Sequence, residues 1–200
     1  GVTNGQLLGF SVQEGLAGLE NLAGVPGNVG GDIYGNAGMF PEGIAPAVSQ
    51  VHCVGTEGVD QWLSKEDCGF GYRTSRFKQT KEIILEARFV LKPDTKEEIA
   101  ARVRERITKY KRGVQPTSEP CSGCMFKNPE GNHAARLIDE AGLKGKQIGG
   151  AQVSPLHANF IINTGGATAD HVLQLTSYIK QQIRDRYGIQ LQEEVQYLGF

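Results

Sequence analysis

The sequence has no surplus of either charge and no long apolar run. Its 200 residues hold 21 Lys and Arg against 22 Asp and Glu, a net charge of −1, without a long basic stretch. Nucleic acids and anionic membranes attract clustered basic side chains, so neither role gains support. No apolar run reaches the roughly 18–20 residues that span a bilayer, and the Gly-rich, mildly polar N-terminus is unlike a signal peptide. We therefore expect a cytoplasmic protein that binds neither nucleic acid nor membrane.

Cysteine is scarce as well. The four cysteines are Cys53, Cys68, Cys121 and Cys124, and a cytosolic chain of this size does not need disulfides. The last two have the spacing of a zinc or redox pair, but zinc would need two further ligands and the first two are not a second close pair. The prolines on either side of the pair favour a loop over the helix start that a thiol redox motif uses. We predict no metal site.

Glycine is the compositional excess. The 27 glycines concentrate in the first part of the chain, where they indicate tight turns or backbone pressed against a ligand. Hydrophobic residues make up 39% and charged residues 22%, a balance that can build a soluble core. The length suits one large domain or two small ones. Residues 113–122 hold two prolines and indicate a connector, so we expect two domains, 1–113 and 114–200.

Hydrophobic periodicity predicts an irregular first part followed by mixed strands and helices. Residues 1–46 indicate turns and short elements. Alternation predicts strands at 48–54, 82–91, 148–153, 159–163 and 190–198, with Ile83, Leu85, Ala87, Phe89 and Leu91 on one face of the second. Apolar stripes and capping residues predict helices over residues 95–110, 132–141 and 168–187. Because helices and strands mix without strict alternation, we predict the α+β class.

The glycine-rich block Gly24-Val25-Pro26-Gly27-Asn28-Val29-Gly30-Gly31 has two interpretations. Its bare backbone N–H groups can line a phosphate or a flat ring. The glycine spacing differs from the dinucleotide-binding fingerprint, and no clear strand precedes it. From these residues alone, a structural turn and a ligand loop are equally good interpretations.

Two other motifs also have both a chemical and a structural interpretation. Arg73, beside Tyr72, can present a planar charged fork to a carboxylate or phosphate, or it can be a surface arginine. Cys124 can be a reactive thiol, because Gly123 frees the backbone and Lys127 favours a thiolate, or it can be a small buried residue.

Near the end of the chain, His157 and a pair of glutamates raise the same question. A lone histidine is more often structural than chemical. Glu193 and Glu194 lie in the predicted terminal strand, where adjacent side chains point to opposite faces. One of them can therefore point inward while the other meets solvent.

Taken in order, these motifs resemble one family, the UDP-N-acetylenolpyruvoylglucosamine reductases (MurB). GLAGLENLAGVPGNVGG followed by Asn36-Ala37-Gly38 resembles the family's flavin-contacting segment, and YRTSRF resembles its Tyr-Arg-x-Ser-x-Phe motif. Gln115-Pro116 followed by SGCMFKNP resembles its proton-donor loop. AARLIDEAGLKGKQIGGAQVSPLHANFIIN and the final LQEEV complete the set. The resemblance extends from the first of these motifs to the end of the chain.

The resemblance implies a flavoenzyme of peptidoglycan synthesis. FAD takes hydride from NADPH and delivers it to the β-carbon of UDP-N-acetylglucosamine enolpyruvate, and an enzyme acid protonates the α-carbon to give UDP-N-acetylmuramate. Arg73 would hold the substrate carboxylate, and Glu194 would help to hold and polarise the intermediate. Cys124 lies where the family carries a serine or cysteine acid, and a thiol is the stronger acid of the two.

The resemblance also implies the binding residues. Tyr72, Asn128, Lys144 and His157 match positions that contact the UDP-sugar, and a cation at Lys144 suits a diphosphate. The cofactor residues implied are Val25, Pro26, Gly27, Val29, Gly30, Gly31, Asn36 and Gly38. The two domains would be the remainder of a flavin-binding α+β domain and a smaller α+β substrate-binding domain, with the site in the cleft between them.

Two departures from the family pattern qualify this expectation. The family's N-terminal flavin segment has no counterpart here, so we expect a truncated chain, a naturally shortened form, or a partner chain that supplies the rest; without such a partner we expect a monomer. A tyrosine-bearing insertion of one branch is also missing, which favours the shorter type-two branch.

Two rival functions follow. The first is a flavin-free fragment that only binds the UDP-sugar. The second is an oxidase on the same fold, which Arg73, Glu194 and an acid at Cys124 disfavour, because oxidation needs a base.

Overall fold

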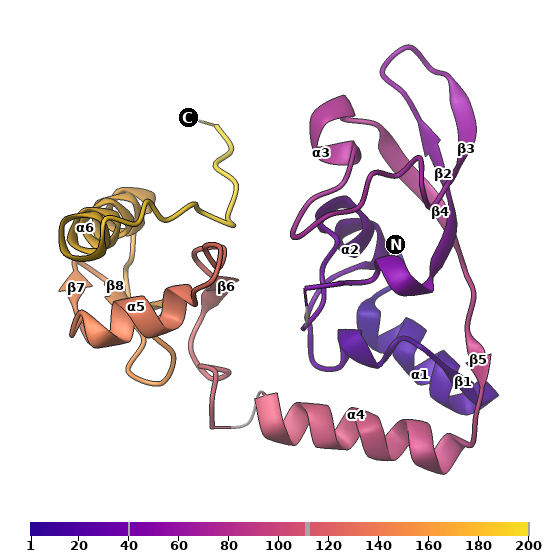
Figure 1. Ribbon diagram of the computed structural model, residues 1–200, viewed down its shortest axis with the longest axis horizontal. Coiled ribbons are helices and arrows are strands. Elements are labelled where there is room, and N and C mark those ends of the chain that lie inside the picture. Colours follow the sequence, from indigo (N-terminus) through magenta and orange to yellow (C-terminus); the bar gives the residue numbers. More distant parts are fainter. Residues whose placement is uncertain (40, 111–112, 200) are drawn as a thin grey trace. The chain divides into compact units, whose positions relative to one another are not determined.

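The computed structural model describes residues 1–39, 41–110 and 113–199. It divides into two compact units, Gly1–Lys109 and Tyr110–Phe200 (Figure 1), each with its own hydrophobic core. Every strand pair is antiparallel, and helices pack beside the sheets. The predicted α+β class is therefore confirmed. The boundary between the units lies slightly before the predicted one, and the roles assigned to the two domains stay predictions.

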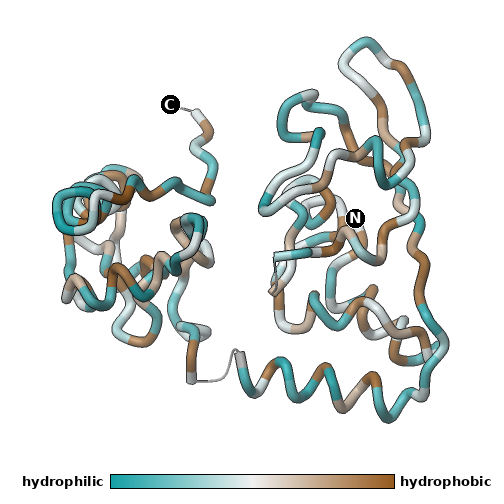
Figure 2. The backbone as a smooth tube through the Cα atoms, in the orientation of Figure 1, coloured by the Kyte–Doolittle hydropathy of each residue, from teal (hydrophilic) through white to brown (hydrophobic). Residues whose placement is uncertain are grey.

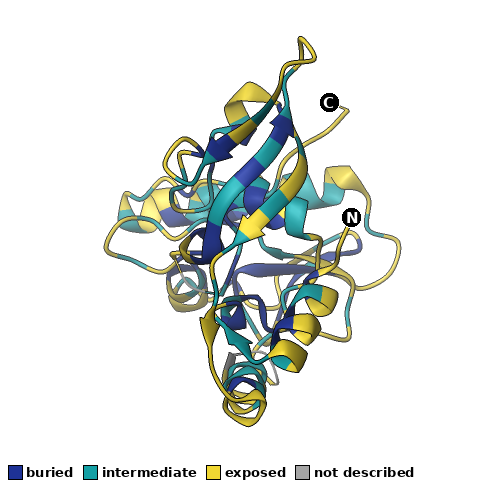
Figure 3. Cartoon of the chain, turned by 90° about the vertical axis from the view of Figure 1, so that its right-hand side faces the viewer, coloured by how far each residue is buried: buried dark blue, intermediate teal, exposed yellow. Residues whose placement is uncertain are grey.

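The first unit is built around a three-stranded sheet of order β3-β2-β4. Its strands are β2 (Val48–Val54), β3 (Asp60–Ser64) and β4 (Ile83–Phe89), and a second, two-stranded sheet pairs β1 (Leu16–Ala17) with β5 (Lys92–Pro93). Its helices are α1 (Asn4–Glu14), α2 (Val29–Gly35), α3 (Phe77–Thr80) and α4 (Lys96–Tyr110), with 3-10 turns η1 (Glu20–Leu22) and η2 (Ala45–Ala47). Figure 3 shows buried residues recurring along the central strand, β2.

Helix α1 is longer than the short elements predicted for residues 1–46. Thr3 and Gln6 cap its start reciprocally: the Thr3 N–H donates to Gln6 Oε1 (2.9 Å) and the Gln6 N–H donates to Thr3 Oγ1 (3.2 Å). Gly15, with φ 66°, ends it in the left-handed conformation. Start and stop signals at both ends outweigh the low helix propensity of the glycines inside it.

The strand predicted at residues 82–91 is present as β4, but the prediction of which side chains point to the core is partly wrong. Ala87 and Phe89 pack toward the core as predicted, whereas Ile83 and Leu85 are 63% and 54% exposed and Ile84 packs inward instead. The register explains the reversal, because His52 pairs with Glu86 while the next residue, Cys53, pairs with Ile84. The extra residue is a β-bulge, which inverts the alternation beyond it.

Helix α4 follows its predicted cap and stripe. The Glu98 N–H donates to Thr95 Oγ1 (3.3 Å), and the Thr95 N–H donates to Asp94 Oδ1 (2.7 Å). Ile99 is fully buried, and Val103 and Ile107 pack against the core of the first unit. Figure 2 shows hydrophilic and hydrophobic positions alternating along this helix, as expected of a helix with one apolar face.

The second unit pairs a four-stranded sheet of order β6-β9-β8-β7 with two helices. The strands are β6 (Cys121–Cys124), β7 (Gln147–Ile148), β8 (Ala151–Val153) and β9 (Phe160–Asn163), and the helices are α5 (Ala134–Glu140) and α6 (Ala169–Tyr187). Helix α6 contacts β7, β8 and α5 (Figure 1). Its predicted stripe is confirmed: Leu175, Ile179 and Ile183 are buried, Thr168 caps its start and Gly188 its end.

Two predicted strands of this unit are wrong in form. Residues 148–153 are a tight β7–β8 hairpin around Gly149 and Gly150 instead of one strand, because Gly149 adopts a left-handed φ of 55°. Residues 190–198 form only an isolated bridge, Phe126 with Glu193. Each of these segments alternates in sequence but has no long partner strand to pair with. Within the described part of the chain, no helix is long and apolar enough to cross a membrane.

Candidate functional site

The glycine-rich loop of the first unit is held by the start of helix α1. The Asn4 N–H donates to the Gly27 carbonyl oxygen (3.0 Å), and Asn4 Nδ2 donates to the Val25 carbonyl oxygen (3.2 Å). The Val29 N–H donates to the Val2 carbonyl oxygen (3.0 Å). The loop is therefore held on one side by Val2 and Asn4, while Pro26 and Gly27 are exposed.

Asp32, in the first turn of α2, is a buried acid that the sequence interpretation did not single out. Its side chain is 3% exposed, and its Oδ2 has no hydrogen-bond partner among the described atoms, as is also true of Asn4 Oδ1. Burial raises the pKa of the Asp32 carboxyl to about 6 against a partial opposing effect of the Asn4 amide. The Asp32 carboxyl, buried beside the glycine-rich loop, therefore titrates near pH 6.

The glycines of this loop fall into two kinds. Gly30 and Gly31 are ordinary helical positions, and a Cβ added to either would meet nothing within 4 Å. Gly38 and Gly43 instead press on each other: a Cβ on Gly38 would lie 2.9 Å from the Gly43 Cα, and one on Gly43 would collide with Asn36. Packing within the chain explains why Gly38 and Gly43 are glycines. It does not explain why Gly30 and Gly31 are.

Asn36 acts as a clamp inside the first unit. It is 3% exposed, ends α2 with φ 47°, and its Nδ2 donates to the Gly71 carbonyl oxygen (2.9 Å). Its Oδ1 accepts from the Ala45 N–H (3.1 Å). Asn36 thus fastens the end of the glycine-rich segment to the loop that carries Arg73, a structural role that the sequence interpretation missed.

Arg73 lies in a strained turn. Gly71 and Thr74 exchange backbone hydrogen bonds of 3.0 and 3.2 Å around Tyr72 and Arg73, and Arg73 has φ 54°. The two other non-glycine residues with positive φ, Asn36 and Lys81, are helix C-caps, so of the described residues Arg73 alone has this conformation away from a helix end. Such strain costs about 1–3 kcal/mol and clusters at functional sites.

The Arg73 side chain meets the glycine-rich segment directly. Its Nη2 donates to the Gly38 carbonyl oxygen (2.8 Å), and its guanidinium lies 5.3 Å from the centroid of the Tyr72 ring. Lys78 Nζ donates to the Arg73 carbonyl oxygen (2.9 Å). Tyr72 is 37% exposed and, with Asn36, lines a cavity of about 380 Å³. Two motifs that are separate in the sequence therefore form one surface in the first unit.

In the second unit, Cys124 and Glu194 come together. The Glu194 N–H donates to the carbonyl oxygen of Met125 (2.8 Å), the residue after Cys124. Met125 belongs to the core of this unit, as do Leu191 and, at its edge, Val195. Cys124 and Glu194 are therefore on neighbouring segments of this unit, and both are half-buried.

Glu193 has the structural role of the two glutamates. Its Oε1 accepts from Lys180 Nζ (2.8 Å) on helix α6. This ion pair holds the last segment against the helix.

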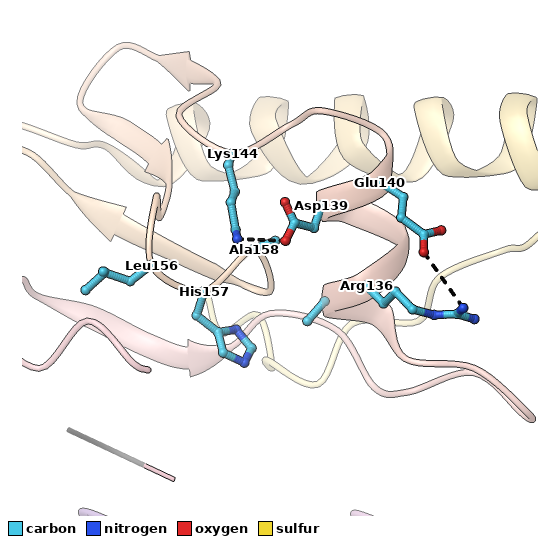
Figure 4. Close-up of a pocket in the computed structure, with 8 residues that line it drawn as sticks. Arg136, Asp139, Glu140, Lys144, Leu156, His157 and Ala158 are labelled. Carbon is cyan, nitrogen blue, oxygen red and sulfur yellow. Dashed lines mark hydrogen bonds and ion pairs between the residues drawn. The ribbon is translucent and has the colours of Figure 1, made fainter. Parts of the chain in front are cut away.

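Lys144 and His157 line one cavity in the second unit. The cavity measures about 560 Å³ and is also lined by Arg136, Asp139 and Glu140 of helix α5. Lys144 Nζ donates to Asp139 Oδ2 (2.7 Å), and Figure 4 shows Lys144 extending toward Asp139 while His157 lies nearby. Burial, with a smaller effect of the Lys144 charge, lowers the pKa of His157, so His157 is neutral near pH 7.

The helix residues of this cavity were not predicted. Arg136, Asp139 and Glu140 are three and four residues apart on an exposed helical face, a spacing that places side chains side by side and was visible in the sequence. Asn128 also has a structural role, since its Oδ1 accepts from the Ala134 N–H (3.0 Å) at the start of α5.

The described residues contain no group of three or more His, Cys, Asp or Glu that could hold a metal ion. Cys53 and Cys68 are both buried in the core of the first unit.

Comparison with known proteins gives consistent matches. The family profile described as "UDP-N-acetylenolpyruvoylglucosamine reductase, C-terminal domain" matches residues 115–198. UDP-N-acetylenolpyruvoylglucosamine reductase 1 of Bacillus thuringiensis subsp. konkukian is 46% identical over 189 residues, which cover 94% of this chain and 62% of that protein. The chain therefore spans 62% of the length of this curated relative.

Two further matches cover more of the relative. A UDP-N-acetylenolpyruvoylglucosamine reductase of Bacillus licheniformis is 43% identical over 182 residues, which cover 90% of this chain and 98% of that protein. The crystal structure of the reductase from Thermus caldophilus has a TM-score of 0.86 and 37% identity, and the match covers 97% of this chain and 69% of that one.

Proposed function

Because the chain belongs to the UDP-N-acetylenolpyruvoylglucosamine reductase family, we propose that it reduces UDP-N-acetylglucosamine enolpyruvate to UDP-N-acetylmuramate with FAD and NADPH, in peptidoglycan synthesis in the cytoplasm. The observation that carries the proposal is the hydrogen bond from Arg73 to Gly38. It joins the arginine expected to hold the substrate carboxylate to the segment expected to hold the flavin.

The glycine-rich segment fits a flat cofactor. Gly30 and Gly31 lie in α2 with open space where a side chain would be, although glycine in a helix costs about 1 kcal/mol relative to alanine. A ligand that lies against bare backbone accounts for that composition. The residues that would hold FAD are Val25, Pro26, Gly27, Val29, Gly30, Gly31, Asn36 and Gly38, and FAD supplies the hydride when it is bound.

Arg73 would bind the carboxylate of the enolpyruvyl group. Its guanidinium is a planar fork whose backbone is fixed by the Gly71–Thr74 turn and whose side chain is held by Gly38 and Tyr72. A donor fixed in advance stabilises charge that develops on the carboxylate side of the substrate without reorganising. This reasoning accounts for strain in the Arg73 backbone, which a surface arginine would not need.

Cys124 would donate a proton to the α-carbon, and Glu194 would help to hold the intermediate. The two residues lie on neighbouring segments of the second unit, joined by the hydrogen bond from the Glu194 N–H to the Met125 carbonyl oxygen, and both are half-buried. An acid and a carboxyl group placed together suit protonation of an enolate-like intermediate.

The cavity of the second unit would take part of the sugar nucleotide. Lys144 and Arg136 supply positive charge to a diphosphate, and the neutral His157 can donate or accept a hydrogen bond. Asp139 competes for Lys144, so a phosphate that binds there exchanges one ion pair for another.

A second candidate is a chain that binds the UDP-sugar without flavin. It is favoured by the second unit, which has its own core and cavity. In this case FAD binding needs a further segment, on this chain or on a partner chain.

Absorption spectra of the purified chain before and after FAD addition test the proposal first. Flavin bands that co-purify or return stoichiometrically, followed by NADPH oxidation that requires UDP-N-acetylglucosamine enolpyruvate, are the expected results. A colourless chain that still binds the UDP-sugar in calorimetry supports the second candidate. Absence of both flavin and sugar-nucleotide binding contradicts both.

A further inference from the structure

The two cysteines of strand β6 are brought together by an irregularity in the strand. In a regular strand, residues three apart face opposite sides and lie about 10 Å apart. Here Cys121 pairs with Ile162 and Cys124 pairs with Phe160, with a register shift between them. Four residues of β6 thus lie opposite three residues of β9.

This compression has two geometric results. Phe160 and Ile162 are two residues apart in β9, so they share one face of the sheet, and the cysteines opposite them share it too. Two residues of strand span about 6.6 Å, and the Cα atoms of a disulfide are about 4.4–6.8 Å apart. Gly123, with φ 83°, provides the bend between the cysteines.

Solvent exposure distinguishes Cys121 and Cys124 from the other two cysteines of the chain. Cys121 is exposed and Cys124 is half-buried, and both carry reduced thiols. Cys53 and Cys68 are each 0% exposed, and burial raises the pKa of the Cys68 thiol to about 11, so those two are poor nucleophiles. The chain therefore holds an accessible pair and a protected pair.

We propose that Cys121 and Cys124 are a redox modification site that closes to an intrastrand disulfide when the protein meets a hydroperoxide. The Cys121 thiolate attacks the peroxide: an S–O bond forms, the O–O bond breaks, and the sulfenic acid and an alcohol or water result. The Cys124 thiolate then attacks that sulfur, an S–S bond forms, and the hydroxyl leaves as water. Two thiols lose two hydrogens and two electrons, which the peroxide accepts.

The consequence for catalysis rests on the proposed function. If Cys124 is the proton donor, the disulfide removes the donor, and a dithiol reductant restores it. Closure of the disulfide also keeps Cys124 from oxidising irreversibly to the sulfinic acid.

Peptide mass spectrometry tests the disulfide without reference to activity. Trypsin releases residues 113–127, which contain both cysteines, as one peptide. After treatment of the whole chain with hydrogen peroxide and alkylation of the remaining thiols, we expect this peptide to be unalkylated and lighter by two hydrogens. The change should reverse with dithiothreitol, while Cys53 and Cys68 remain thiols that alkylate once the chain is unfolded.

The Cys121→Ser variant is the matched control. It should show no loss of two hydrogens, and Cys124 in it should proceed to an oxide that dithiothreitol does not reverse. Peroxide that leaves both thiols of the wild-type peptide alkylated, or that links Cys121 between two chains, overturns the proposal.

Activity measured on the same samples separates this proposal from the proposed function. The Cys121→Ser variant should keep its basal activity, but its inactivation by peroxide should not be recovered. A disulfide in a chain without reductase activity contradicts the proposed function alone. Reductase activity without the disulfide contradicts the redox site alone.

Discussion

Arg73 Nη2 donates a 2.8 Å hydrogen bond to the carbonyl oxygen of Gly38. The bond joins a strained turn to the last glycine of the segment expected to hold the flavin. It fixes the direction of the guanidinium before any substrate arrives. A change at either residue should therefore disturb a pre-formed site.

Replacing Arg73 with lysine should lower kcat/KM for the sugar nucleotide by about 10- to 100-fold, because a charged hydrogen bond contributes roughly 1.5–3 kcal/mol and lysine has no planar fork. Steady-state kinetics measures the change. The control is Arg88→Lys, since Arg88 stacks on Trp62, 4.0 Å from its ring centroid, outside the candidate site. Equal kinetics for the Arg73 variant and the wild type would contradict the carboxylate role.

Replacing Cys124 should separate the two half-reactions. Cys124→Ser retains a weaker acid and should keep measurable turnover, whereas Cys124→Ala should lose sugar-nucleotide reduction while NADPH still bleaches the flavin. Stopped-flow absorbance follows both steps. Full turnover by the alanine variant would remove Cys124 from the mechanism.

Asp32→Asn should change how stability depends on pH. The folded pKa is raised to about 6 from 3.8, so the folded state binds more protons, and stability falls as pH rises between these values. The variant should match the wild type near pH 4 and exceed it at pH 8, by about 3 kcal/mol at 1.36 kcal/mol per pKa unit.

Urea unfolding measures the Asp32 effect through Trp62, the single tryptophan of the chain, which lies in β3 of the first unit. The same stability difference between variant and wild type at both pH values would show that Asp32 does not titrate as its burial implies.

Asn36→Ala should destabilise the first unit even without flavin. It removes two hydrogen bonds, each contributing about 0.5–1.5 kcal/mol, and puts alanine at a left-handed position. We expect a loss of about 2–3 kcal/mol in Trp62-detected unfolding. Asn28→Ala is the control, because Asn28 is exposed and makes no side-chain capping bond. An unaffected free energy of unfolding would contradict the structural role of Asn36 and leave only its predicted role in cofactor binding.

Lys144→Ala should weaken UDP-sugar binding, since the cavity loses a cation that can meet a diphosphate. Calorimetry should give an affinity lower by about 10-fold, the effect of roughly 1.4 kcal/mol. Lys146→Ala provides the comparison, because Lys146 lies over the Tyr178 ring (4.7 Å) instead of lining the cavity. If both variants bind equally well, the nucleotide does not use this cavity.

Much of the fold was predictable where local signals agree. Helix α6 has a cap at Thr168, an apolar stripe and a stop at Gly188, and sequence analysis predicts both its ends. Strand β4 was predictable in position but not in facing, because the bulge opposite His52 and Cys53 depends on the partner strand. The last segment alternates like a strand, but whether a partner lies beside it is a tertiary property.

The candidate site shows the same division. Residue type and order indicated Arg73, Cys124 and Lys144 as separate motifs. The bond from Arg73 to Gly38 and the proximity of Glu194 to Met125 depend on chain folding, and no local pattern encodes them. Asp32 was missed because its significance comes from burial, and an acid early in a helix ordinarily stabilises the helix dipole.

The close approach of Gly38 and Gly43 has a consequence for large-scale mutagenesis. Gly43 is not itself among the predicted site residues, yet with φ 62° and the Asn36 backbone beside it, every other residue is excluded there. If Arg73 and Cys124 act as proposed, a survey that scores each substitution by growth should rank Gly43 with them. Such a survey would give the same low score to substitutions that do not fit sterically and to substitutions that remove a chemical group. Separate measurements of folding and of turnover distinguish the two causes.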